Sequence, residues 1–113
     1  MSLFSLSDVN AQYGYSCGFG GIPLPLREEV DSLIEHKKQW QLAQWLYSED
    51  ITKSVYAAEG LIRLQNDGIE LTNTQIRKIK ELKNSEAKVM TCNGCLIGED
   101  SIKNVLSKFL LKE

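Results

Sequence analysis

Residues 54–68 read S-V-Y-A-A-E-G-L-I-R-L-Q-N-D-G and carry the clearest pattern of a packed helix in the chain. Two adjoining faces of this helix are apolar, so more than half of its circumference is expected to be buried. The apolar positions are Val55, Ala57, Ala58, Leu61, Ile62 and Leu64. We therefore predict that this helix lies at the centre of the fold, between packing partners.

Gly60 lies in the middle of the same helix. A glycine costs roughly 1 kcal/mol relative to alanine inside a helix, which predicts a compensating role such as the close approach of another helix. Asp67 and Gly68 then form a C-terminal stop, because glycine readily adopts the conformation that ends helices.

The composition fits one globular domain, which we place at residues 12–113. The chain has 113 residues, of which 42% are hydrophobic, and its 13 basic and 15 acidic side chains give a net charge of −2. This balance predicts no general attraction to nucleic acid. No stretch reaches the about 20 apolar residues that a membrane-spanning helix needs.

The first residues need a separate interpretation. Met1-Ser2-Leu3 resembles a start added for expression, and Val9-Asn10-Ala11 resembles the small-residue site at which a bacterial secretory signal peptide is cleaved. We predict that residues 1–11 are such a remnant or a disordered start, and that the protein is exported to the periplasm or secreted. A cytoplasmic location is the alternative.

The rest of the chain is predicted to be all-α, with about five short antiparallel helices. An irregular Gly-rich arm at residues 13–25 should lie against the helical body, because it is rich in aromatic and aliphatic side chains. The helices are expected at residues 25–37, 40–47, 54–68, 72–83 and 101–111, with caps at Thr52 or Ser54 for the third and at Asp100 or Ser101 for the last. Thr72 and Gln75 form a capping-box pattern. Residues 88–97 predict a short extended hairpin around Asn93-Gly94.

Two surfaces are candidates for binding a partner. Trp40 and Tyr47 belong to an aromatic-rich helix and either complete its buried face or form a recognition surface. Arg77 and Lys80 lie on the basic side of the helix at residues 72–83, which is also typical of a solvated face.

The segment Y-A-A-E-G-L-I-R-L followed by Asn66-Asp67-Gly68 resembles the inner helix of HEAT-type helical repeats. In that family, small residues allow helices to stack closely and an Asp-Gly pair ends the helix. The similarity covers about residues 40–84. It implies a binding or packing role, and it carries no functional residue over to this chain.

The residues best suited to covalent or metal chemistry are the three cysteines, Cys17 and the pair in Cys92-Asn93-Gly94-Cys95. A catalytic redox pair, a zinc site that adds His36 and a structural disulfide are the competing interpretations. An Asn-Gly turn would bring Cys92 and Cys95 within disulfide distance, which favours that pair narrowly. The rival is a bond from Cys17 to either of them, which would close a longer loop.

These patterns predict a non-catalytic helical module that binds a protein partner or associates with itself. No acid pair, catalytic triad, phosphate-binding loop or metal set is evident in the sequence, so we predict no catalytic residue, no metal and no cofactor. The lone His36 is expected to be solvated or to cap a helix. The alternative function is thiol–disulfide exchange by Cys92 and Cys95.

Overall fold

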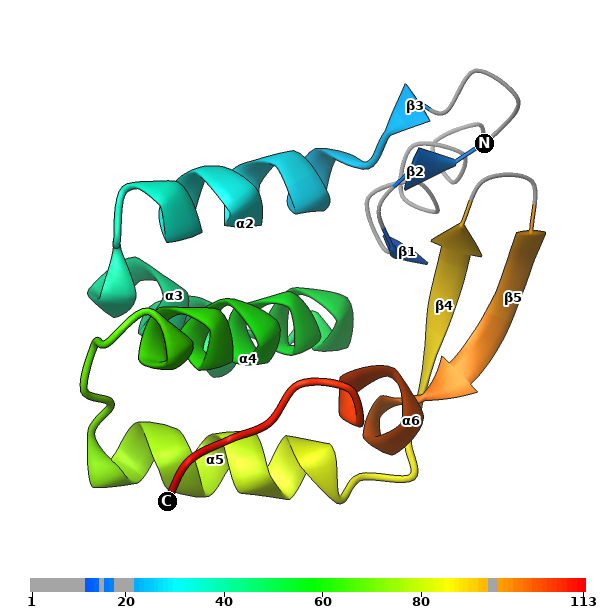
Figure 1. Cartoon of the computed structure of the whole chain (residues 1–113). Helices are drawn as coiled ribbons and strands as arrows, with labels where there is room; N and C mark the ends of the chain where they lie inside the picture. The colour runs from blue at the N-terminus through cyan, green and yellow to red at the C-terminus, as the bar shows by residue number, and fades with distance from the viewer. Residues whose placement is uncertain (1–11, 15, 18–21, 94–95) are drawn as a thin grey trace.

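The computed structural model describes residues 12–14, 16–17, 22–93 and 96–113, with 16–17, 22–23, 93 and 96 described by their backbone (Figure 1). The helices of this part are α2 Pro25–Glu35, α3 Gln39–Leu46, α4 Ile51–Asn66, α5 Asn73–Lys83 and α6 Ile102–Leu106. The strands are β1 Gln12–Tyr13, β2 Ser16–Cys17, β3 Ile22–Pro23, β4 Lys88–Asn93 and β5 Leu96–Ser101. The fold therefore mixes helices with sheet, and the predicted all-α class is wrong.

The sheet arises because the arm before α2 pairs with the predicted hairpin. Strands β4 and β5 are antiparallel, and β1 adds to β4 in parallel, which gives the order β1-β4-β5. Gln12 pairs with Met90 and Tyr13 with Thr91. A two-residue strand is too short to show an alternating pattern, so the sequence gives no sign of this pairing.

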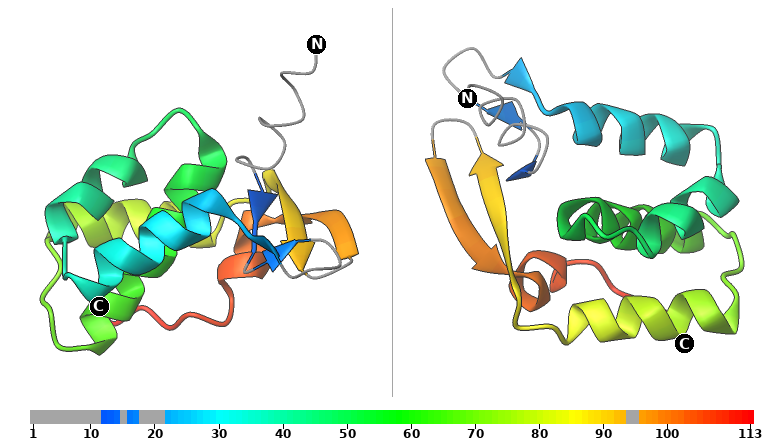
Figure 2. Two further views of the ribbon diagram at one scale, coloured as in Figure 1. Left: turned by 90° about the horizontal axis from the view of Figure 1, so that it is seen from above. Right: turned by 180° about the vertical axis from the view of Figure 1, so that it is seen from behind.

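The helices form a stack at one side of the sheet. In Figure 1, α2, α4 and α5 lie one above another, and the β4–β5 hairpin stands at one end of them. The reverse view in Figure 2 shows α3 beside α4. Helix α4 contacts each of the other helices and both β1 and β4, so it occupies the central position that its sequence predicts.

Two of the three predicted helix N-caps are confirmed by the structure. The capping box of Thr72 and Gln75 is present at α5, and Ser101 caps α6. Helix α4, however, is capped by Asp50, whose side chain accepts a hydrogen bond from the backbone N–H of Thr52, and not by Thr52 or Ser54. The acceptor lies earlier because α4 begins three residues before the predicted start.

The last helix is shorter than its apolar pattern predicts. It ends at Leu106, and the Nζ atom of Lys83 donates hydrogen bonds to the backbone carbonyls of Leu106 and Phe109. Further along, the side chain of Gln65 donates to the carbonyl of Lys112 and accepts from its N–H. These side-chain partners satisfy the backbone of the extended tail, which can then pack its apolar side chains without helical hydrogen bonds.

Gly60 marks the predicted close approach of helices. A Cβ atom at this position would lie 3.1 Å from Leu42 Cδ2 and 3.3 Å from Val30 Cγ2. Leu42 belongs to α3 and Val30 to α2, and both side chains are fully buried. The glycine thus lets two helices pack against α4 at once.

We expect Gly60→Leu to destabilise the protein by about 1–3 kcal/mol, because overpacking outweighs a gain in helix propensity of nearly 1 kcal/mol. Urea unfolding followed by circular dichroism measures this change. Gly98→Ala is the matched control, since its added Cβ would have only Thr91 Oγ1 nearby, at 3.8 Å. A midpoint that rises for Gly60→Leu would contradict the close crossing.

Candidate functional site

Trp40 and Tyr47 form an exposed aromatic face on α3. Their side chains are 68% and 55% exposed, whereas Leu42 and Leu46 of the same helix are fully buried. Trp40 and Tyr47 are seven residues apart, so they lie on the same side of the helix, away from the core. The possibility that they complete the buried face is therefore excluded, and the two rings are available at the surface.

Helix α5 contacts this exposed side of α3. The Nζ atom of Lys78 lies 5.6 Å from the centre of the Tyr47 ring, a cation–π arrangement. The side-chain amide of Gln39 donates to the carbonyl of Glu70 and to the Oε1 atom of the buried Gln75, each at 3.0 Å. These contacts join both ends of α3 to α5 and its preceding loop. We name the surface made by Trp40, Tyr47 and Lys78 the aromatic face.

Arg77 and Lys80 do not belong to the aromatic face. They line an open depression of about 610 Å³ along α5, together with residues 73, 76, 81 and 84. The Nζ atom of Lys80 pairs with a carboxylate oxygen of Glu113 at 2.9 Å. Lys78, on the same basic side of α5, is the residue whose charge lies against the aromatic face, and it was not among the predicted partner-binding residues.

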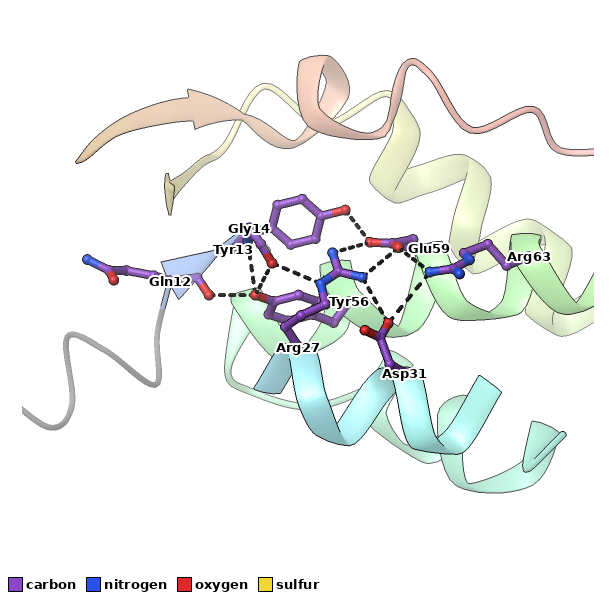
Figure 3. A network of polar contacts seen from close by, with 8 residues as sticks. All are labelled: Gln12, Tyr13, Gly14, Arg27, Asp31, Tyr56, Glu59 and Arg63. Carbon is purple, nitrogen blue, oxygen red and sulfur yellow. Dashed lines mark hydrogen bonds and ion pairs between the residues drawn. The ribbon is translucent and has the colours of Figure 1, made fainter. Parts of the chain in front are cut away.

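A buried charged cluster, which the sequence analysis missed, lies between α2, α4 and β1 (Figure 3). The guanidinium of Arg27 makes two hydrogen bonds of 2.8 Å with the carboxylate of Glu59. Both side chains are removed from solvent, with exposures of 3% and 0%. The pair joins α2 to α4 across 32 residues of sequence.

Two tyrosines extend this cluster to the N-terminal arm. The Tyr13 hydroxyl donates to Glu59 Oε1 at 2.5 Å, and the Tyr56 hydroxyl donates to the Gln12 carbonyl at 2.8 Å. The Gly14 N–H in turn donates to the Tyr56 hydroxyl at 3.0 Å. The Tyr13 and Tyr56 rings lie 4.6 Å apart, and the Arg27 guanidinium lies within 5.6 Å of each ring centre.

The outer edge of the cluster reaches the surface. Arg63 donates to Glu59 Oε2 at 3.1 Å and also lies 3.6 Å from Asp31. Arg27 donates through its Nε atom to the Gly14 carbonyl at 2.9 Å. We name the set of Tyr13, Arg27, Asp31, Tyr56, Glu59 and Arg63 the buried cluster.

Burial and charge act in opposite directions on these groups. Burial raises the pKa of the Glu59 carboxyl, but hydrogen bonds and the positive charge of Arg27 outweigh it and hold that pKa below its usual value. Burial likewise lowers the pKa of the Arg27 guanidinium, and the hydrogen bonds and charge of Glu59 raise it above its usual value. For Tyr56, burial dominates and raises the pKa of the hydroxyl to about 12.

This arrangement is suited to fixing structure. Among the residues that the structure describes, every buried side-chain nitrogen and oxygen has a hydrogen-bond partner. Glu59 remains an anion that is already neutralised by Arg27. We therefore interpret the buried cluster as a clamp that holds the arm against α2 and α4.

Of the predicted disulfide candidates, Cys92 has a described side chain. Strand pairing places Cys92 opposite Ile97 and Asn93 opposite Leu96. Cys92 is fully buried on β4. Cys95 and the Cys17 side chain lie outside the described residues, so the connectivity stays a prediction.

His36 and the predicted export signal are the remaining sequence-based candidates. His36 is exposed, and its Nδ1 atom lies 2.9 Å from the carbonyl of Ser32 near the end of α2. Within the described ranges, no three His, Cys, Asp or Glu side chains gather as a metal site would require. No helix of that part has the length and apolar character to cross a membrane. Residues 1–11, on which the predicted export signal rests, lie outside the residues that the structure describes.

Comparison with known proteins identifies no relative of this chain. No protein-family model, curated protein sequence or solved structure matches the chain. The similarity to HEAT-type repeats therefore stays a prediction.

We expect Glu59→Gln to destabilise the protein by about 3–5 kcal/mol at neutral pH, because it removes the buried carboxylate partner of Arg27 and leaves this charge with the half-exposed Asp31, at 3.3 Å. The pKa of Glu59 is lowered by folding, so its stabilisation is complete above the unfolded pKa of about 4.3 and is lost as pH falls through the lower folded value. Denaturant unfolding at a series of pH values below about 5 should show this loss in the parent protein. Glu35→Gln, at an exposed position of α2, is the control, and an equal change in both variants would contradict the clamp.

Tyr13→Phe should cost about 1.5–3 kcal/mol, since it removes a hydrogen bond to a charged group. Tyr47→Phe removes the same hydroxyl from an exposed ring and should change the unfolding free energy by less than about 0.5 kcal/mol. Thermal or urea unfolding compares the two. A Tyr13 variant as stable as the Tyr47 variant would show that the arm is held by other contacts.

Proposed function

We propose that the protein is a non-catalytic module that binds a partner protein through the aromatic face. The observation that carries this proposal is the exposure of Trp40 and Tyr47 on one side of α3. Tryptophan and tyrosine dominate the energetics of many protein interfaces, because each buries a large area with few rotatable bonds. Here the two rings contribute little to the core, so their exposed apolar surface can be buried against a partner.

The position of the face also favours recognition. Leu42 and Leu46 hold α3 in the core, and the Gln39 side chain donates a hydrogen bond to Gln75 of α5, so the rings project from a rigid base. Lys78 adds a positive charge beside Tyr47. A partner that offers an apolar pocket next to a carboxylate would complement this combination.

An exported location remains part of the proposal. It rests on the cleavage-like sequence before Gln12 and on the predicted disulfide, which would need an oxidising compartment. The alternative function in thiol exchange draws no support from the position of Cys92. Reactive thiols are accessible and are often activated at a helix N-terminus, whereas this sulfur is buried on a strand.

Photo-crosslinking tests the aromatic face directly. A benzophenone amino acid replaces Trp40 or Tyr47 in cells that naturally make the protein, and Lys103, exposed on α6, provides the control position. We expect defined crosslinked products from positions 40 and 47 and none from position 103. A product of twice the chain's mass would identify a second copy as the partner.

Matched substitutions separate binding from folding. Trp40→Ser and Tyr47→Ser should change the unfolding free energy by less than about 0.5 kcal/mol, because both rings are exposed, yet they should abolish the defined product at the neighbouring crosslinking position. Equal crosslinking from all three positions, or none from any, would contradict the proposal.

A further inference from the structure

A second surface feature lies where α3 meets α2. It is a hollow of about 310 Å³ between the two helices. Residues 29, 32 and 33 of α2 and residues 41, 44 and 45 of α3 face each other across it, as one turn of each helix brings them to the same side. The lining side chains are Glu29, Ser32, Leu33, Gln41, Gln44 and Trp45.

The polar part of this lining is suited to hydroxyl groups. Ser32, Gln41 and Gln44 each offer both a donor and an acceptor, and Glu29 offers acceptors alone. Among the described residues, no lysine, arginine or histidine lines the hollow, whereas Glu29 brings a carboxylate that would repel a phosphate or carboxylate. The lining therefore favours a neutral ligand that donates and accepts hydrogen bonds in alternation.

These polar side chains are also available. Throughout the described part of the chain, the side chains of Glu29, Ser32, Gln41 and Gln44 form no hydrogen bond or ion pair with other protein groups. They contrast with Gln39 and Gln75, whose amides are used to join α3 to α5. Their bonding capacity is directed to solvent or to a ligand.

The apolar part of the lining consists of Leu33 and Trp45. Both are partly buried against the hydrophobic core, which fixes their positions. The Nζ atom of Lys53 lies 4.7 Å from the centre of the Trp45 ring and further restrains it. A fixed indole provides a flat apolar surface, and its N–H adds a donor at the edge.

We propose that this hollow binds a neutral sugar ring. A pyranose presents hydroxyl groups around its edge and C–H groups on its faces, which match the amide and carboxylate groups and the Trp45–Leu33 surface respectively. The volume lies at the lower end of the range of small-ligand sites, which fits one sugar unit. Trp40 and Tyr47 are not among the lining residues, and the sugar site does not depend on the function proposed for them.

Titration of the ¹⁵N-labelled protein tests the sugar site. Glucose, galactose, mannose, N-acetylglucosamine and cellobiose are added separately while the amide signals and the Trp45 indole signal are followed. At least one sugar should give saturable shifts confined to residues 29–33 and 41–45, with a Kd on the order of millimolar.

Three variants determine whether the lining residues act as proposed. Glu29→Ala and Gln44→Ala should each weaken binding by about tenfold, as expected for the loss of a hydrogen bond to the ligand. Glu35→Ala removes an exposed carboxylate of α2 outside the hollow and should leave the Kd unchanged. Absence of saturation with every sugar, shifts elsewhere in the chain, or equal affinity in all three variants would overturn the proposal.

Discussion

The ion pair between Arg27 and Glu59 is the contact on which the arrangement of the chain depends. It connects α2 to α4 within the core, and Tyr13 and Gly14 bind to the same two side chains. A buried ion pair adds little net stability compared with apolar packing, because both charges lose their hydration. Its effect here is on specificity: once both charges are buried, only an arrangement that keeps Arg27, Glu59 and Tyr13 together avoids a large penalty.

The sheet follows from this constraint. Because the Tyr13 hydroxyl is held by Glu59 and the backbone beside it by Tyr56, residues 12–13 are presented to β4 in a fixed direction. A two-residue parallel strand could not form this pairing by backbone hydrogen bonds alone. The side chains of α4 therefore organise the sheet as well as the helical stack.

The sequence predicted the features that repeat at short range. Five helices were expected close to their observed positions, the capping box of Thr72 and Gln75 was recognised, and residues 88–97 were correctly assigned to a hairpin. The contacts that connect distant segments were missed, because Arg27 and Glu59 each resemble an ordinary charge on a helix. One signal was present: Tyr56, Glu59 and Arg63 form a polar stripe on a helix predicted to be surrounded, so Glu59 needed a buried cation.

The exposed side of α3 and the centre of α4 both depart from the usual distribution of apolar residues inside and charged residues outside. The chain buries Arg27 and Glu59, which are among the residue types least often removed from water, and exposes Trp40, one of the most apolar. Hydrophobic sorting explains neither position. The buried charges are compensated by the hydrogen bonds and ion pairs that they make, whereas the Trp40 ring stays largely in contact with water. Association with another molecule would supply that compensation, which is why the functional proposal rests on α3 and the structural one on α4.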